Sequence, residues 1–210
     1  MFLLPRVATP DDPLRLAVFI SGSGSGMEAL LRHQEENECS HTTRVVISNV
    51  AGVAGLARAK AYGVAREVIE HQGQPRENAD DRRQAHEEAI HALLVELRIE
   101  AVILSGYMRI LTPWFIDRWE GRLINIHPSL LPEFQGAHAH RDVLSAGVKV
   151  TGCTIHFVDT GMDSGRIIAQ REVSVHHGDN EESLGERVKQ VEHILYPLVI
   201  DAFASGNLPL

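Results

Sequence analysis

The chain has 210 residues, of which 44% are hydrophobic and 23% charged, a composition typical of a globular domain rather than a disordered or fibrous protein. The charge sum of 20 basic and 28 acidic residues is −8, which disfavours nucleic-acid binding. No apolar run reaches the roughly 18 residues that a membrane helix needs, and the N-terminus lacks a signal-peptide core. We therefore expect one cytoplasmic domain over residues 1–210, with residues 1–13 as a flexible tail.

The two cysteines are Cys39 and Cys153. They are too few for a disulfide framework and lack metal-ligand spacing, which is typical of a protein in a reducing compartment.

The first half of the chain alternates short apolar runs with helical patterns. Strands are expected at residues 14–20, 44–48, 65–69 and 101–104, and helices at 27–36, 53–62 and 80–97. Strands that are separated by helices favour a parallel sheet covered on both faces.

The pattern changes after residue 121. A strand is expected at 123–127 and a short helix after it, followed by strands at 151–158 and 166–173. The connection DTGMDSG is too short for a parallel crossover, so the last two strands should run antiparallel. The sequence thus predicts an α/β fold of three layers, with a mixed sheet whose first half is Rossmann-like and parallel.

A C-terminal helix is expected to begin near Asp179, because Asp179 and Glu182 have capping-box spacing. Its apolar side is predicted to carry Leu184, Val188, Val191, Leu195, Leu198 and Val199.

A glycine-rich loop, SGSGSG, joins the first predicted strand to the first helix. Small residues there let a ligand approach the backbone amides at the positive end of the helix, which favours a phosphate. The spacing fits neither a P-loop nor a dinucleotide fingerprint, so a monophosphate is more plausible than a dinucleotide. A flexible turn without a ligand is the alternative.

Asn125 and His127 alternate along the strand at 123–127, so their side chains should project from the same face at its carboxyl end. An amide donor beside an imidazole is suited to stabilising a developing oxyanion. Asp163, in the DTGMDSG connection, would favour the cationic imidazole if the strands adjoin. The alternatives are a buried pair satisfied by loop backbone and an aspartate that satisfies its own turn.

The stretch NIHPSLLPEFQGAHAHRD, with ISGSGS, LSGYMRILTP, GCTIHFVDTGMDSG and QVEHILYP, resembles the folate-dependent glycinamide ribonucleotide formyltransferase family, in order from about residue 16 to about residue 208. The resemblance implies the formyltransferase fold. It also implies that a formyl group passes from the cosubstrate 10-formyltetrahydrofolate to the amine of a phosphorylated glycinamide riboside in purine biosynthesis, without a metal. Asn125 and protonated His127 would stabilise the oxyanion, while Asp163 would hold His127 and help to move the proton.

The resemblance also implies the substrate contacts. Gly24, Ser25 and Gly26 would bind the phosphate, Glu192 the ribose hydroxyls, and Lys189 would lie near the phosphate. An ion pair between Lys189 and Glu192 is the alternative. The family often has asparagine where this chain has Ser23 and Gly26, and Gln135 and Ala137 also replace frequent residues, so the phosphate contacts and the following loop are expected to differ.

The folate would lie against an apolar segment and its neighbours, by the same resemblance. The residues implied are Met108, Arg109, Ile110, Leu111, Val158 and Arg83, with Tyr107, Ile116 and Leu123 as apolar lining. The alternative places Met108, Ile110 and Leu111 in the core. His138, His140 and His156 share no recognisable metal-ligand spacing, so no metal is expected.

Three other functions remain as alternatives. A 10-formyltetrahydrofolate hydrolase normally carries an N-terminal regulatory domain, and an initiator-tRNA formyltransferase normally carries an added C-terminal domain. We expect neither added domain, because few residues lie outside the predicted fold. A non-catalytic phosphate-ligand-binding protein would leave Asn125, His127 and Asp163 without a joint purpose. We expect small-molecule substrates, no nucleic acid or membrane partner, and a monomer or homodimer.

Overall fold

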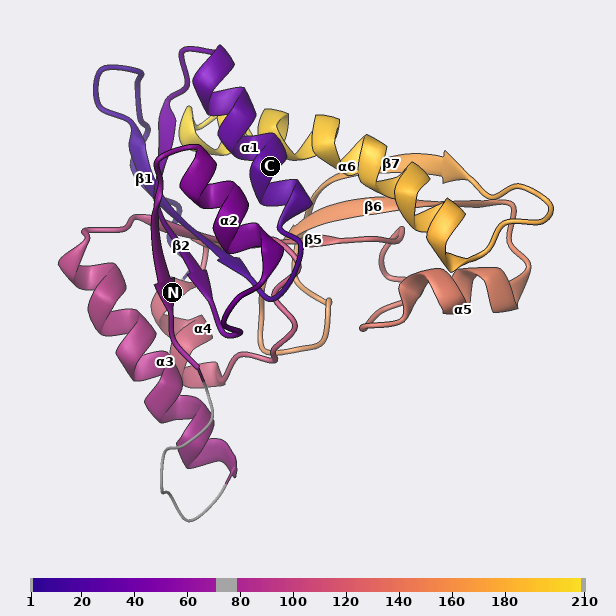
Figure 1. Ribbon diagram of the computed structural model, residues 1–210, viewed down its shortest axis with the longest axis horizontal. Coiled ribbons are helices and arrows are strands. Elements are labelled where there is room, and N and C mark those ends of the chain that lie inside the picture. The colour runs from indigo at the N-terminus through magenta and orange to yellow at the C-terminus, as the bar shows by residue number, and fades with distance from the viewer. Residues whose placement is uncertain (1, 71–78, 209–210) are drawn as a thin grey trace.

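The computed structural model describes residues 2–70 and 79–208. Its centre is a seven-stranded sheet with the order β3-β2-β1-β4-β5-β6-β7, drawn in Figure 1. The strands are β1 (Leu14–Ile20), β2 (His41–Ser48), β3 (Ala65–Val68), β4 (Ala101–Leu104), β5 (Leu123–His127), β6 (Val150–Phe157) and β7 (Ile167–Ser174).

The sheet combines parallel and antiparallel strand pairs. The pairs among β1 to β5 are all parallel, and each of their connections is long enough for the crossover that a parallel pair needs. The pairs β5–β6 and β6–β7 are antiparallel. The predicted mixed α/β sheet with a Rossmann-like first half is confirmed.

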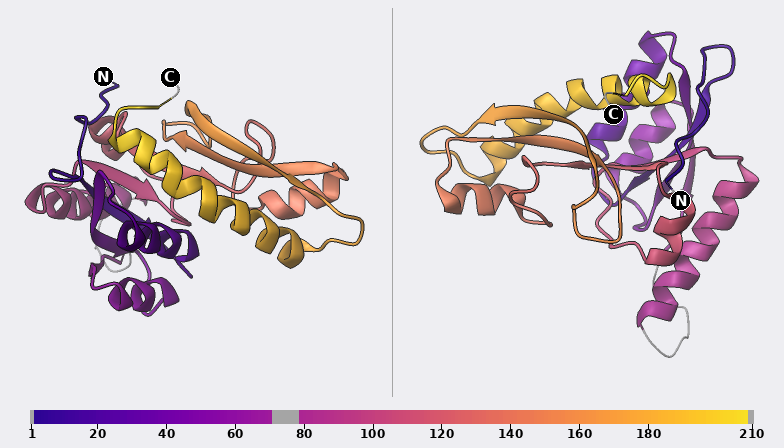
Figure 2. Two further views of the ribbon diagram at one scale, coloured as in Figure 1. Left: turned by 90° about the horizontal axis from the view of Figure 1, so that it is seen from above. Right: turned by 180° about the vertical axis from the view of Figure 1, so that it is seen from behind.

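Helices cover both faces of the sheet (Figures 1 and 2). Buried side chains of α1, α2, α5 and α6 form one apolar cluster with the sheet, while those of α3 and α4 form a second cluster. Strand β1 supplies both clusters, because its successive side chains point to opposite faces. The bounds of the helices are α1 (Ser25–Glu36), α2 (Ala54–Ala61), α3 (Ala79–Glu96), α4 (Pro113–Trp119), α5 (Ala139–Ala146) and α6 (Glu181–Ala204).

Several predicted boundaries differ from the structure. Helix α1 begins at Ser25, two residues before its predicted start, and β2 begins at His41, three residues earlier than predicted. Helix α4 was not predicted. It begins with Pro113, which suits a first helical turn, and buries Phe115 and Trp119 against the second cluster.

The predicted start of α6 is also wrong by one residue. Asn180, with an extended backbone, caps the helix: its side chain accepts a hydrogen bond from Ser183 N, and the Ser183 hydroxyl accepts one from the Asn180 backbone N–H. Asp179 instead forms an ion pair with Arg187. Leu198, predicted to be buried, is 53% exposed, because the buried face of the helix follows Leu184, Val188, Tyr196, Ile200 and Phe203.

The single-domain organisation and the flexibility of residues 1–13 stay predictions. In the structure the described part of this N-terminal segment contacts the rest of the fold. Ala8 is buried and its N–H donates to Ala204 O, and Arg6 forms ion pairs with Asp12 and Glu100.

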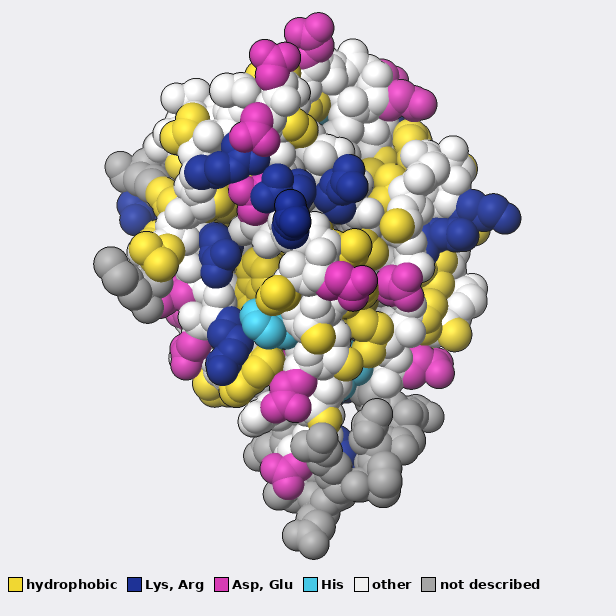
Figure 3. Space-filling model, turned by 90° about the vertical axis from the view of Figure 1, so that its left-hand side faces the viewer, with side chains coloured by type: hydrophobic (Ala, Val, Ile, Leu, Met, Phe, Trp, Pro, Cys, Tyr) yellow, Lys and Arg dark blue, Asp and Glu magenta, His cyan; other side chains and the backbone are white. Residues whose placement is uncertain are grey.

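Charges of both signs are mixed on the face drawn in Figure 3, where basic, acidic and hydrophobic side chains lie next to one another. Arg6 and Arg15 both form ion pairs with Glu100. None of the described helices combines the length and apolar character needed to cross a bilayer.

Candidate active site

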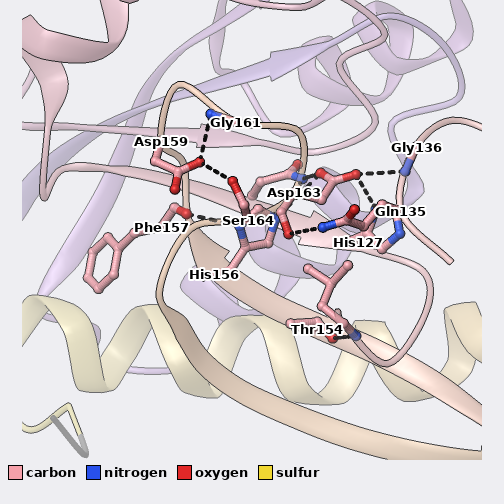
Figure 4. A network of polar contacts seen from close by, with 12 residues as sticks. His127, Gln135, Gly136, Thr154, His156, Phe157, Asp159, Gly161, Asp163 and Ser164 are labelled. Carbon is pink, nitrogen blue, oxygen red and sulfur yellow. Dashed lines mark hydrogen bonds and ion pairs between the residues drawn. The ribbon is translucent and has the colours of Figure 1, made fainter. Parts of the chain in front are cut away.

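Asn125 and His127 lie at the carboxyl end of β5, opposite His156 and Thr154 of β6 in the antiparallel register. His127 is buried and Asn125 half-buried. Both side chains reach Asp163, which lies in the loop between β6 and β7 (Figure 4). The structure therefore brings together the three residues that the sequence proposed as catalytic.

The carboxylate of Asp163 is shared among several donors. Its Oδ2 accepts the Gly136 N–H at 2.8 Å and lies 3.3 Å from His127 Nδ1. Its Oδ1 lies 3.5 Å from Asn125 Nδ2 and 3.7 Å from His156 Nε2. Asp163 has a positive φ of 49°, a conformation that few residues other than glycine adopt and that places its side chain over the end of β5.

The imidazole of His127 faces two hydrogen-bond acceptors. Nδ1 faces the Asp163 carboxylate, and the Nε2 proton is donated to Phe134 O at 2.8 Å. An ionised carboxylate and a carbonyl accept hydrogen bonds but do not donate them. A doubly protonated, cationic ring satisfies both contacts, which is the form that stabilises an oxyanion.

His156 fixes the orientation of the Asn125 amide. Its Nδ1 lies 2.9 Å from Phe157 O, so Nδ1 carries the proton and Nε2 accepts from Asn125 Nδ2 at 3.1 Å. Burial lowers the pKa of His156, which keeps the ring neutral and able to accept. The NH₂ group of Asn125 therefore points toward Asp163 rather than away from it.

A network that the sequence did not reveal holds the loop after β5. The hydroxyl of Thr154, fully buried, donates to Ser129 O at 2.7 Å and accepts from Leu131 N at 3.0 Å and Gln170 Nε2 at 2.9 Å. The Ser129 hydroxyl donates to Glu133 O at 2.7 Å. A threonine in the middle of an apolar strand was the available signal, because a buried hydroxyl needs partners.

The glycine loop packs closely on the start of α2. Gly24, the residue before α1, has φ +65°, and a Cβ there would lie 2.9 Å from Gly55 Cα. Gly55 N–H in turn donates to Gly22 O at 3.1 Å. No side chain caps the start of α1, so the first amides around Ser25 and Gly26 remain oriented for an anion.

Ser21 links the glycine loop to the predicted folate segment. Its N–H donates to Gly106 O at 3.1 Å, its hydroxyl accepts the Met108 N–H at 2.8 Å, and the same hydroxyl donates to Asn49 Oδ1 at 2.6 Å. The two segments follow the neighbouring strands β1 and β4. The two predicted ligand sites are thus tied to each other through one hydroxyl.

The folate segment presents apolar side chains to solvent. Met108 is 70% exposed and Ile110 is 64% exposed, so the alternative that places them in the core is wrong. Leu111 is buried, as that alternative expected. Of the predicted lining, Tyr107, Ile116 and Leu123 are also buried, and Val158 is half-buried against the same cluster.

Glu87 of α3 holds the end of the segment that begins at Met108. It is fully buried, and its carboxylate accepts hydrogen bonds from the Thr112 N–H at 2.9 Å and from the Thr112 hydroxyl. Burial raises the pKa of Glu87, while the positive charges of Arg109 and Arg83 oppose that rise. The two arginines predicted for the folate tail therefore lie near one buried carboxylate, which the sequence did not single out.

Glu192 and Lys189, which the sequence proposed for the ribonucleotide, both lie on α6. Glu192 is half-buried, and burial raises its pKa to about 7 although the charge of Lys189 opposes the rise. Lys189 forms an ion pair with Glu186, at 2.6 Å, rather than with Glu192. The alternative of a Lys189–Glu192 pair is therefore wrong.

Histidines of the loop and of α5 are separated from one another. His138 precedes α5 and is exposed, while the His140 ring lies beside Gly185 of α6. Within the described part of the chain, the group that brings three potential metal ligands together is instead His33, Cys39 and Asp201, far from these residues. The sequence missed it because Asp201 is distant from the other two along the chain.

Two surface hollows lie away from the predicted site. One, of about 480 Å³, is bordered by α1, β2 and the segment from Tyr62 to Ala65, and the other, of about 230 Å³, lies between α1 and α6. Neither hollow is lined by a predicted site residue. The candidate site is therefore identified from the arrangement of its polar side chains and not from either hollow.

Comparison with known families agrees with this geometry. The model of the family described as formyl transferase matches residues 14–200. The chain therefore belongs to the formyl transferase family.

Its relatives are named for one reaction. The phosphoribosylglycinamide formyltransferase of Escherichia coli (strain K12) is 40% identical over 94% of this chain and 90% of its own length. A solved structure of glycinamide ribonucleotide transformylase 1 from Symbiobacterium toebii has a TM-score of 0.87 at 40% identity, covering 92% of this chain and 89% of that one. The phosphoribosylglycinamide formyltransferase structure from Brucella melitensis has a TM-score of 0.85 at 44% identity, covering 93% and 97%.

Larger proteins contain the same unit. The human trifunctional purine biosynthetic protein adenosine-3 is 44% identical over 93% of this chain, which spans only 19% of that protein.

Proposed function

We propose that this protein transfers the formyl group of 10-formyltetrahydrofolate to the primary amine of glycinamide ribonucleotide, a reaction of de novo purine biosynthesis. The observation that carries the proposal is the meeting of Asn125, His127 and Asp163 in a chain of the formyl transferase family. The names of its E. coli, S. toebii and B. melitensis relatives support this acceptor.

The chemistry follows from the donors that these residues supply. The amine nitrogen attacks the formyl carbon, a carbon–nitrogen bond forms, and the carbonyl oxygen becomes an oxyanion. Asn125 Nδ2 and the cationic His127 ring donate hydrogen bonds to that oxygen, each worth about 100- to 1,000-fold in turnover. As the bond to the folate nitrogen breaks, the proton of the attacking amine passes to that nitrogen with the help of Asp163.

Before His127 can donate its Nε2 proton to the oxyanion, the hydrogen bond from Nε2 to the Phe134 carbonyl has to break. Its carbonyl accepts the Nε2 proton of His127, and Phe134 itself has a positive φ of 55°. We expect the segment around Phe134 and Gly136 to shift when the acceptor binds, so that the proton reaches the substrate oxygen instead.

The remaining residues place the two substrates. The amides of Gly24, Ser25 and Gly26 bind the phosphate, and Glu192 the ribose, with Lys189 nearby. The pterin lies along the segment that begins at Met108, near Val158, and Arg109 with Arg83 meets the anionic tail. We expect the reaction to need no metal and to take place in the cytoplasm, with the protein a monomer or homodimer.

A formyl-acceptor assay tests the proposal. Purified protein and 10-formyltetrahydrofolate are mixed with glycinamide ribonucleotide, with water alone, or with initiator tRNA, and release of tetrahydrofolate is followed by absorbance. Release that depends on the ribonucleotide is expected. Release in water alone would identify a hydrolase, and ligand binding without turnover, unchanged by His127→Ala, would identify a binding protein.

A further inference from the structure

A group of potential metal ligands lies at the end of α1 opposite the glycine loop. His33 lies in the last turn of α1, Cys39 in the connection to β2, and Asp201 near the end of α6. Helices α1 and α6 contact each other, and their ends approach in Figures 1 and 2. One ligand atom from each of the three residues lies within 4.8 Å of the other two.

The donor set is suited to zinc. It offers one imidazole nitrogen, one sulfur and one carboxylate oxygen, and a thiolate with a carboxylate balances the charge of a divalent cation. Tetrahedral zinc with bonds of about 2.0 to 2.3 Å keeps its ligand atoms about 3.3 to 3.6 Å apart. His33 Nε2 and Asp201 Oδ2 lie 2.8 Å apart in the metal-free arrangement. Shifts on the order of 1 Å would therefore complete the site.

Neighbouring residues already orient the proposed ligands. Gln34 accepts the Thr43 N–H with its oxygen, so its NH₂ group donates to His41 Nδ1 at 2.7 Å. The Nε2 proton of His41 is therefore donated to Asp201 Oδ1, at 2.9 Å, while Oδ2 faces His33 Nε2 at 2.8 Å, and a cation between these two atoms would replace that contact. The His41 side chain is fully buried. Such hydrogen bonds from outside the coordination sphere are typical of metal sites, where they fix the ligands.

We propose that His33, Cys39 and Asp201 bind a zinc ion that ties the end of α1 to the end of α6. A water molecule would take the fourth position of the tetrahedron. The site is at the far end of α1 from the residues proposed for formyl transfer, so its role is structural and independent of that reaction. His41 acts as a positioning residue through Asp201.

Cobalt and zinc binding to the full chain test this proposal. Addition of Co²⁺ to metal-free, reduced protein is expected to produce a sulfur-to-cobalt charge-transfer band at one equivalent, which Zn²⁺ abolishes by displacement. Cys39→Ser should remove the band. Cys153→Ala is the matched control and should keep it, because Cys153 lies buried in β6 among apolar core residues. His41→Gln should weaken zinc binding by about 10- to 100-fold.

Thermal unfolding provides a second measurement that does not depend on sulfur. Zinc should raise the unfolding temperature of the wild-type protein, since a ligand that binds only the folded state stabilises it, and it should leave Asp201→Asn unchanged. Absence of a charge-transfer band in the wild-type protein, or the same zinc-dependent shift in wild type and Asp201→Asn, would overturn the proposal. Such a result would leave a metal-free hydrogen-bonded cluster.

Discussion

Replacing Asp163 by asparagine isolates the charge that faces His127. The side chain keeps its shape, and its remaining oxygen can still accept the Gly136 N–H that now lies 2.8 Å from Oδ2. That oxygen would also still face His127 Nδ1, now 3.3 Å from Oδ2, but it would be neutral, and the new NH₂ group would face Asn125 Nδ2 and His156 Nε2 instead. The negative charge that favours a cationic ring would be lost, and with it the stabilisation that such a cation gives to the oxyanion.

Two costs set the expected size of the effect. A hydrogen bond to a charged group contributes about 1.5 to 3 kcal/mol, which corresponds to about 10- to 150-fold in rate at 1.36 kcal/mol per factor of ten. Loss of an oxyanion donor costs about 2.7 to 4 kcal/mol. Both act through the same ring and do not add, so kcat/KM of Asp163→Asn should fall by about 100- to 1,000-fold.

Asp159→Asn is the matched control in the same loop. Among the described residues, the Asp159 carboxylate accepts hydrogen bonds from within its own turn, from Gly161 N at 3.0 Å and Ser164 Oγ at 2.8 Å, and asparagine can keep these bonds. Initial rates of tetrahydrofolate release and the unfolding temperature are measured for both variants. The reasoning is refuted if Asp163→Asn keeps wild-type kcat/KM, or if both variants lose activity equally.

Three further predictions concern the substrate segments. A Cβ at Gly26 would lie 2.8 Å from Ser105 Oγ, so Gly26→Asn should lower the free energy of unfolding by about 1 kcal/mol by forcing the serine off its rotamer. Ser105→Ala should remove that loss, and simple additivity in a urea-unfolding double-mutant cycle would contradict the expected contact. Burial raises the pKa of Glu192 to about 7, so the stability that its protonated carboxyl contributes is fully present below the unfolded pKa near 4.5 and is lost as the pH rises through 7. Glu192→Gln should therefore be more stable than wild type at about pH 8 but not at about pH 5. Equal pH dependence of the free energy of unfolding in the two proteins would contradict this prediction. Glu87→Gln can satisfy only one of the two Thr112 donors, so the KM for the folate should rise about tenfold while the KM for the ribonucleotide stays constant. Steady-state kinetics in which both KM values rise together would argue for a general loss of structure.

Local rules explain why much of the fold could be predicted. The apolar runs of β1 and β4 have the composition of buried strands, and the nine-residue connection between β6 and β7 is too short for a parallel crossover whatever the rest of the chain does. The twofold repeat of a strand similarly puts Asn125 and His127 on one face without any knowledge of their neighbours.

Contacts between distant segments explain what the sequence could not give. Gly136 donates to Asp163, which lies 27 positions further along the chain, and the Phe134 carbonyl accepts from His127 at a residue whose positive φ its residue type does not predict. The end of α6 illustrates a smaller failure: Leu198 has the spacing of a core residue, but the buried face of the helix turns away from it. Such outcomes depend on packing against elements that a local pattern does not contain.

The topology favours a ligand site at this edge of the sheet. The strand order runs β3-β2-β1 in one direction and β4-β5 in the other, and in open α/β sheets ligands bind at the carboxyl ends of the strands where the order reverses, here β1 and β4. The glycine loop follows β1, the folate segment follows β4, and Ser21 bonds one to the other. The next strand, β5, ends in Asn125 and His127, so the groups proposed for chemistry lie one strand beyond the point where the two proposed ligand sites adjoin. The Ser21 hydroxyl therefore links the two proposed ligand segments directly, so a displacement of the segment at Met108 would change a hydrogen bond of the glycine loop.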